Sequence, residues 1–251
     1  MTDLISAFDA AGISLFLVGI VFAASCIQAI TGIGFGVIAG PMLLVSMGSG
    51  TAIQLSIILS FLIAVLLAPA TLPRVSWTLL RPLLAGVVLG TPIGALAFAF
   101  LSIDMLKIIA ALVVAAMTVI ATGFLSRHPV FETDSRSRRI GSGILSGIFN
   151  AALAMPGPPI AAYATAIRRD KHTIRATTLV TFLFAYPIAL AFQAGFSGFG
   201  EGLGWAALLL ALPTVAGTII GLFVAAIISE RYFRWLTIAF LLASVVALVG
   251  F

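Results

Sequence analysis

The sequence predicts an all-α integral membrane protein made of two inverted-topology repeats, and three observations support this prediction. Of the 251 residues, 62% are hydrophobic and only 8% are charged, and the mean hydropathy is +1.25. Soluble domains contain about 25% charged residues, so this chain is adapted to lipid. The chain also divides into ten apolar segments, and its two halves place glycine and proline at matching positions. We expect about five elements in each repeat, the first two forming an interrupted or re-entrant helical hairpin.

The length of each segment predicts its role. A helix needs roughly 20 apolar residues to cross a bilayer core about 30 Å thick. The second, sixth and seventh segments are too short or too broken for ordinary spans, so each half opens with an interrupted pair and continues with three full helices. The ten segments are expected at residues 11–30, 31–48, 51–72, 78–101, 104–125, 140–154, 156–168, 173–196, 203–228 and 231–251.

One long hydrophilic stretch, from Arg127 to Arg139, separates the two halves. We interpret residues 1–125 as the first membrane repeat, 126–139 as a cytoplasmic linker and 140–251 as the second membrane repeat. We expect no cleavable signal peptide, because the N-terminal region is acidic and lacks the basic residues that open such a peptide.

The basic residues predict the orientation in the membrane. If the chain crosses at each segment, four loops share one side. These loops, together with Arg168 at the edge of the third, account for 12 of the 13 basic residues, and only Lys107 falls on the other side. Cytoplasmic loops carry such an excess of Lys and Arg, so both termini are expected outside the cytoplasm. The four loops are at residues 73–81, 126–139, 169–175 and 229–234.

Two matches relate the halves. Residues 90–94 read Gly-Thr-Pro-Ile-Gly and residues 217–221 read Gly-Thr-Ile-Ile-Gly, and Gly40-Pro41 pairs with Gly157-Pro158 in the interrupted elements. Because five elements per half is an odd number, the second copy must be upside down. Inverted repeats are typical of secondary transporters. The glycines at the ends of the first match are expected mainly to let helices pack closely.

The interrupted elements predict a binding site. Irregular backbone survives in hydrocarbon only where it is buried or lines a cavity, and broken helices in both halves indicate a site at the bilayer centre. The starts of half-helices offer free N–H groups and a positive dipole end, which suit a small anion. The alternative is that the glycines only allow close helix packing. The candidate substrate-binding residues are Gln28, Thr31, Gly32, Gly34, Gly36, Asn150, Pro156, Gly157 and Pro158.

Other polar residues are assigned less specific roles. Intramembrane amides are costly unless paired, so Gln54 and Gln193 are interpreted as hydrogen-bonding links between helices. Thr31 either offers its hydroxyl to the substrate or caps the helix that follows. Arg175 either attracts an anion toward the pathway or sets topology, and the second role is favoured. Cys26 is interpreted as a small buried residue.

Several function classes are disfavoured by what the sequence lacks. All eight acidic residues lie in tails or loops, both histidines lie in basic loops, and no HExxH, GxSxG or Walker motif occurs. We therefore expect no enzyme activity, no metal and no cofactor. A single cysteine excludes a disulfide or thiolate cluster within the chain, and the scattered basic residues disfavour nucleic-acid binding. With no intramembrane carboxylate or histidine, no coupling ion is assigned.

The chain resembles the TauE/SafE family of sulfite-exporter-like membrane permeases. The resemblance rests on Thr-Gly-Ile-Gly-Phe-Gly at 31–36 leading to Gly-Pro-Met-Leu at 40–43, and on Ser146-Gly147 followed by Met-Pro-Gly-Pro-Pro at 155–159. Tyr163 and Arg175-Ala176 also fit, and the similarity covers nearly the whole chain. One departure is Asn-Ala-Ala-Leu-Ala at 150–154, where the family usually has more glycine. The resemblance implies movement of sulfite, sulfonates or related small anions across a bacterial inner membrane.

The leading hypothesis is a secondary transporter that holds a small anion between its two interrupted hairpins and works by alternating access. A passive anion channel and a non-transporting membrane subunit that docks a partner are the alternatives. The expected partners are a small anionic substrate and the lipid bilayer, with both termini in the periplasm.

Overall fold

The computed structural model describes residues 13–32, 35–121, 134–167, 171–225 and 230–250, and within these ranges every regular element is helical. The all-α prediction is confirmed, and each expected segment corresponds to one α-helix. The elements are α2 (Leu15–Thr31), α3 (Phe35–Met47), α4 (Thr51–Thr71), the 3-10 helix η1 (Leu72–Arg74), α5 (Trp77–Phe100), α6 (Ile103–Ala121), α8 (Arg136–Leu153), α9 (Gly157–Ala166), α10 (Lys171–Ser197), α11 (Leu203–Val224) and α12 (Glu230–Gly250).

Four helices are long and apolar enough to cross a membrane: Thr51–Arg74, Trp77–Phe100, Arg175–Ser197 and Leu203–Val224. Their outward faces carry large apolar side chains, as in Leu212 and Phe223, which are 72% and 70% exposed. A soluble protein buries such side chains, whereas lipid solvates them. The chain is therefore a multi-pass membrane protein.

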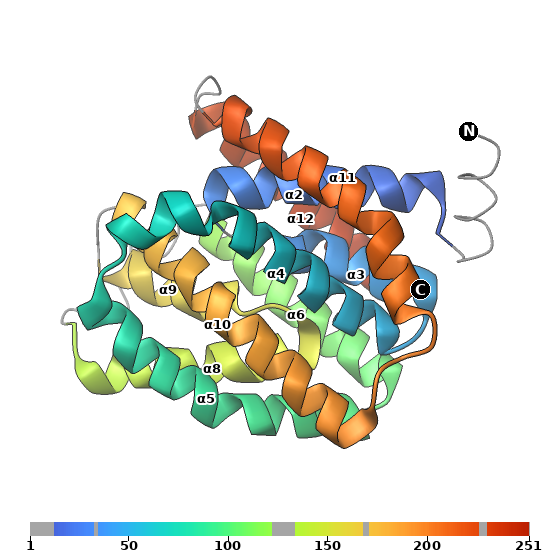
Figure 1. Ribbon diagram of the computed structural model, residues 1–251, viewed down its shortest axis with the longest axis horizontal. Coiled ribbons are helices and arrows are strands. Elements are labelled where there is room, and N and C mark those ends of the chain that lie inside the picture. Colours follow the sequence, from blue (N-terminus) through green and yellow to red (C-terminus); the bar gives the residue numbers. More distant parts are fainter. Residues whose placement is uncertain (1–12, 33–34, 122–133, 168–170, 226–229, 251) are drawn as a thin grey trace.

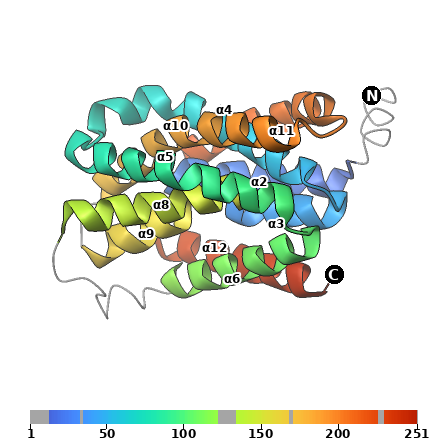
Figure 2. The ribbon, with the colours of Figure 1, turned by 90° about the horizontal axis from the view of Figure 1, so that it is seen from below.

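The helices form a bundle in which segments from both halves interleave (Figures 1 and 2). Helix α4 packs against α10 and α11 on one face of the bundle, and α6 packs against α12 on the opposite face. The broken pairs α2–α3 and α8–α9 lie between these faces, and α2 packs on α11 while α8 packs on α5. The fold thus places both interrupted elements in the interior.

The basic residues gather at one end of the bundle. The end of α4 and the starts of α5, α8, α10 and α12 all lie toward the left of Figure 1. These helix ends contain nine of the ten basic residues in the described part of the chain, and Lys107 lies near the start of α6 at the other end. We call this the basic end. The described part of the chain thus has the one-sided distribution of charge that the loop analysis predicts.

Close glycine contacts hold α5 against α8. A Cβ added at Gly86, Gly90 or Gly94 would lie 2.1, 2.0 or 2.2 Å from a backbone carbonyl oxygen of α8. Gly217 on α11 faces the carbonyl of Phe22 on α2 in the same way, at 2.4 Å. Such distances leave no room for a side chain, so the backbones approach directly. A Cβ added at Gly221 would likewise lie 2.6 Å from the carbonyl oxygen of Cys26 on α2. The interpretation of the four glycines at the ends of the matching motifs as helix-packing residues is confirmed.

Helix α8 begins four residues before the expected segment. Ser135 is its N-cap, and its hydroxyl accepts a hydrogen bond from the N–H of Arg138 at 3.3 Å. Arg139 also pairs with Asp134 immediately before the helix. A serine cap followed by helix-forming arginines is a start signal that hydropathy alone overlooks.

Candidate functional site

The first interruption lies between α2 and α3. Helix α2 ends at Gly32, which adopts the left-handed conformation with φ of 79° and donates its N–H to the carbonyl of Gln28 at 2.7 Å. The side chain of Gln28 then turns toward the next helix, and its Oε1 accepts the N–H of Phe35 at 3.1 Å. Gln28 therefore accepts bonds from both sides of the interruption, with its backbone from the end of α2 and with its side chain from the start of α3.

The second interruption, between α8 and α9, has the same type of helix end. Ala154 adopts the left-handed conformation with φ of 60°, and its N–H donates to the carbonyl of Asn150 at 2.8 Å. Helix α9 then starts at Gly157. Pro156 in between has its carbonyl bonded by the hydroxyl of Ser146 at 2.7 Å. An alanine in this conformation is uncommon, because a Cβ there is strained by roughly 1–2 kcal/mol.

The two interruptions meet in the interior. A Cβ on Gly36, in the first turn of α3, would lie 2.0 Å from the carbonyl oxygen of Ala154. A Cβ on Gly40, one turn further along, would lie 3.7 Å from the side chain of Met155 and 3.9 Å from the carbonyl oxygen of Leu153. The glycine-rich start of α3 therefore packs on the irregular backbone that follows α8. The absence of side chains at these positions is what allows the two elements to approach.

A small cavity lies at this junction. Its volume is about 10 Å³, enough for roughly one water molecule. The cavity receives residues from both interruptions and two aromatic rings from α10. Its lining consists of Gln28, Gly36, Val37, Ala154, Met155, Pro156, Gly157, Phe182 and Tyr186.

The polarity of the lining favours negative charge. The first turn of α3 and the first residue of α9 both border the cavity, and N–H groups in a first helical turn have no acceptor inside their own helix. Gln28 is fully buried, and its Nε2 has no hydrogen-bond partner in the described structure. The residues named above as its lining include no carboxylate. A small anion is the ligand that these donors fit.

The start of α9 is a weaker donor than its position suggests. Pro158 and Pro159 are the second and third residues of the helix, and proline has no N–H. Of the first three residues, Gly157 alone retains its donor. The start of α9 therefore offers one free N–H group among its first three residues, and its contribution to an anion site is mainly the helix dipole.

The predicted site residues are distributed unevenly around the cavity. Gln28, Gly36, Pro156 and Gly157 line it. Asn150 is buried but is not among the lining residues, and its Nδ2 donates to the carbonyl of Ala185 at 2.8 Å. The remaining predicted residues lie nearby or are not placed. The hydroxyl of Thr31 donates to the carbonyl of Ile27, Gly32 packs under Arg175, Pro158 is buried in the first turn of α9, and Gly34 lies outside the described residues.

The two other intramembrane glutamines make hydrogen bonds between segments distant in the sequence. Gln54 on α4 donates to the carbonyl of Gly198 and accepts the N–H of Gly200, both at 2.8 Å. Gln193 on α10 donates to the carbonyl of Ala151 at 2.7 Å. Both side chains are essentially buried. Gln193 thus links α10 to α8, as predicted, whereas Gln54 links α4 to the connection between α10 and α11 and not to a helix.

Sequence reasoning missed the aromatic wall of the cavity. Phe182 and Tyr186 lie one turn apart on α10, with ring centroids 5.4 Å apart, and both are buried. In the sequence they stand in a continuous apolar helix, where an aromatic residue is indistinguishable from ordinary core. A usable signal was the Tyr-Pro pair at 186–187, since a hydroxyl beside a helix-breaking proline is unusual within a membrane span.

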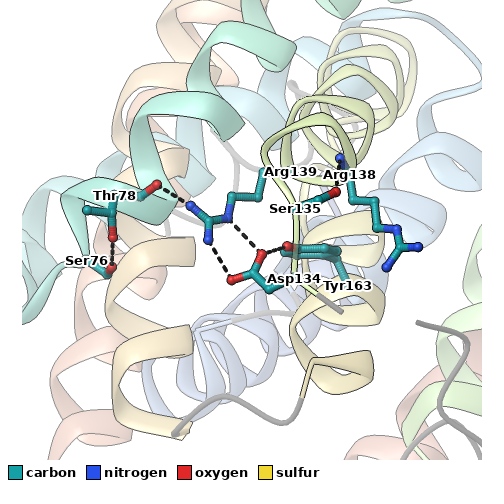
Figure 3. A network of polar contacts seen from close by, with 7 residues as sticks. All are labelled: Ser76, Thr78, Asp134, Ser135, Arg138, Arg139 and Tyr163. Carbon is teal, nitrogen blue, oxygen red and sulfur yellow. Dashed lines mark hydrogen bonds and ion pairs between the residues drawn. The ribbon is translucent and has the colours of Figure 1, made fainter. Parts of the chain in front are cut away.

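A polar network at the basic end fixes the second interrupted pair (Figure 3). Arg139 binds Asp134 through Nε at 2.9 Å and Nη2 at 2.6 Å, and its Nη1 donates to the carbonyl of Thr78 on α5 at 2.8 Å. The hydroxyl of Tyr163 on α9 donates to the same carboxylate of Asp134. The network thus joins α5, α8 and α9. These residues form hydrogen bonds with one another at the basic end, and none of them lines the cavity.

The family assignment follows from a comparison of the whole chain. The model of the family described as "Sulfite exporter TauE/SafE" matches residues 16–248. The chain belongs to the TauE/SafE family. Searches of curated proteins and of solved structures gave no match. TauE/SafE proteins are transporters and not enzymes, and membership indicates a membrane transporter of sulfite-like anions. In the described residues of this TauE/SafE protein, no group of three His, Cys, Asp or Glu side chains is arranged to hold a metal ion.

Proposed function

We propose that this TauE/SafE protein is a secondary transporter that moves sulfite, an organosulfonate or a related small anion by alternating access. The observation that carries the proposal is the meeting of the two interrupted helix pairs at one buried cavity with an unpartnered Gln28 Nε2 in its wall. Broken helices that meet inside a membrane protein are the usual setting of a transporter binding site. Gln28, Gly36, Pro156 and Gly157 are the proposed substrate contacts. Thr31, Gly32, Gly34, Asn150 and Pro158 are proposed to shape or support that site.

The proposal includes an inverted repeat with its halves at residues 1–125 and 140–251. Both interruptions begin with a left-handed residue, Gly32 or Ala154, whose N–H bonds a carbonyl four residues earlier. In each half, that fourth preceding residue is the buried amide Gln28 or Asn150. Helix contacts support the same relation, in which α2, α4, α5 and α6 of the first half are equivalent to α8, α10, α11 and α12 of the second. The contact of α5 with α8 then has its equivalent in the contact of α11 with α2. The contacts α4–α10 and α6–α12 each join two equivalent helices.

The cavity size favours alternating access over a passive channel. A cavity for one water molecule is too small for sulfite, so the lining must separate before an anion enters. Separation toward one side at a time is the motion expected of a transporter whose repeats rock against each other. An open anion pore or a non-transporting subunit would not need such a closed central site.

We also propose that the protein lies in a bacterial inner membrane with the basic end in the cytoplasm and both termini in the periplasm. The excess of Arg and Lys at that end supports this orientation. Alkaline phosphatase fused after residue 251 is expected to be active, whereas fusion within residues 126–133 is expected to be inactive. The opposite pattern would reverse the orientation.

Proteoliposomes provide the functional test. Purified protein is expected to drive saturable uptake of labelled sulfite or a sulfonate and to show counterflow when unlabelled anion is trapped inside. Flux that rises linearly with concentration and lacks counterflow would favour the channel. No protein-dependent flux or binding with any of these anions would contradict the transporter, and stable co-purification with another chain would then favour the subunit.

A further inference from the structure

One face of α10 connects the basic end with the cavity. Arg175, Thr178, Phe182 and Tyr186 follow the spacing that aligns residues along one side of a helix. Phe182 and Tyr186 line the cavity. At 1.5 Å per residue, Arg175 lies about 10 Å along the axis from Phe182, toward the basic end. The first two residues of this row therefore lie on the same face of α10 as the aromatic wall of the cavity, nearer the basic end.

Arg175 is a half-buried cation with unused donors. Its Nη2 donates to the carbonyl of Ala29 near the end of α2, and its side-chain stem covers Gly32, whose added Cβ would lie 2.8 Å from Arg175 Cγ. Its Nε is buried and has no hydrogen-bond partner in the described structure. A guanidinium has five N–H donors, and an oxyanion is the ligand that satisfies several of them together.

Thr178 supplies a second unused polar group in the same row. It is fully buried, and its hydroxyl has no partner in the described structure. The surroundings add positive charge, since η1, which contains Arg74, packs on α10. Asp134, a carboxylate at the same end, is held by Arg139. Two unsatisfied polar groups thus lie on α10 between its basic end and the residues that line the cavity.

We propose that Arg175 and Thr178 form a second, outlying subsite for a small oxyanion on the approach from the basic end to the cavity. This inference rests on the proposed function, because it assigns the route by which the same substrate reaches the central site. Arg175 releases the carbonyl of Ala29 and binds the anion, and the hydroxyl of Thr178 donates to it next. The subsite is built among α2, η1 and α10, so the ligand is a free oxyanion and not a lipid phosphate.

The test reads the local charge directly and does not depend on transport. Cys26 is the one cysteine of the chain, so a C26A background lets T178C be labelled alone. The anionic reagent 2-sulfonatoethyl methanethiosulfonate and its cationic trimethylammonium analogue are added from the basic-end side. The anionic reagent is expected to react faster. R175Q is expected to lower the anionic-to-cationic rate ratio at least about tenfold, because one unit charge a few ångströms away acts on the two reagents in opposite directions.

The controls separate this subsite from a structural role of Arg175. R175K is expected to keep most of the rate ratio. Millimolar methanesulfonate, which does not react with methanethiosulfonates, is expected to slow labelling of T178C equally in vesicles with and without phosphatidylglycerol, whereas slowing by phosphatidylglycerol itself would indicate a lipid site and contradict the proposal. A cysteine unreactive from the basic-end side, or a ratio unchanged by R175Q, would overturn it. Charge-selective labelling without any anion flux would sink the proposed transport function and leave the subsite standing.

Discussion

The contact between Gly36 and the second interruption gives the sharpest prediction. Ordinary contacts of a Cβ begin near 3.4 Å, and a Cβ on Gly36 would lie 2.0 Å from the carbonyl oxygen of Ala154 and 3.0 Å from its carbon. In G36A, the start of α3 must therefore move by about 1.4 Å, because the opposing atoms are backbone and cannot rotate away. Overpacking of this kind typically lowers the free energy of unfolding by about 1–3 kcal/mol.

The displacement of α3 should change anion binding more than it changes the stability of the fold. A shift of about 1.4 Å takes a hydrogen bond of ordinary length beyond the distance at which it contributes. A hydrogen bond to a charged group contributes about 1.5–3 kcal/mol, so loss of one such bond weakens anion binding about 10- to 100-fold. The measurements are the Kd of sulfite, from ligand-dependent thermal stabilisation, and the initial rate of uptake into proteoliposomes.

Two glycine variants are matched controls. In G86A the added Cβ would lie 2.1 Å from the carbonyl oxygen of Ile140, so the overlap is as severe but lies in the α5–α8 contact. This variant should lose stability and keep its affinity. In G19A the added Cβ has nothing within 4 Å, so neither quantity should change. Unchanged sulfite binding by G36A, with G86A destabilised as expected, would refute the placement of the site.

Three further predictions concern individual polar groups. Q28E keeps an oxygen for the N–H of Phe35 but replaces the Nε2 donor by negative charge, so folding should persist while anion affinity falls at least about tenfold. Titration of the purified protein measures this affinity, and equal affinity would exclude Gln28 from the site. Q54A removes two 2.8 Å hydrogen bonds to the α10–α11 connection and should lower the melting temperature without changing Kd, and a weakened Kd would contradict its purely structural role. R139E should reduce expression and thermal stability, with partial recovery in D134R/R139E, and no recovery would argue against the ion pair of Figure 3.

The fold could be predicted well because membrane helices are encoded by simple physical requirements. Apolar length predicted the long spans, so α4, α5, α10 and α11 begin within two residues of the expected segments. Interruptions were predictable because glycine and proline change backbone preferences locally. The start of α8 was harder, since a serine cap and an ion pair extend that helix into a hydrophilic stretch.

Some residues that line the cavity could be predicted from the sequence and others could not. The reason is that the sequence shows which residues lie beside an interruption, but not which distant segments pack against it. Gln28 and Gly36 lie beside an interruption in the chain, so their place at the cavity follows from local reasoning. Phe182 and Tyr186 reach the cavity through packing of α10, which depends on contacts distant in sequence. Asn150 was grouped with Gln28 by analogy between the halves, yet its side chain donates to α10 instead.

The most direct measurement is a structure of the protein with selenite, a heavier chemical relative of sulfite. The account predicts anomalous scattering from selenium between the starts of α3 and α9, within hydrogen-bonding distance of Gln28 Nε2, with the lining residues moved apart to admit it. Selenium bound reproducibly elsewhere, with the Gln28 cavity closed and unchanged, would contradict the claim that the two interrupted helix pairs form the anion site.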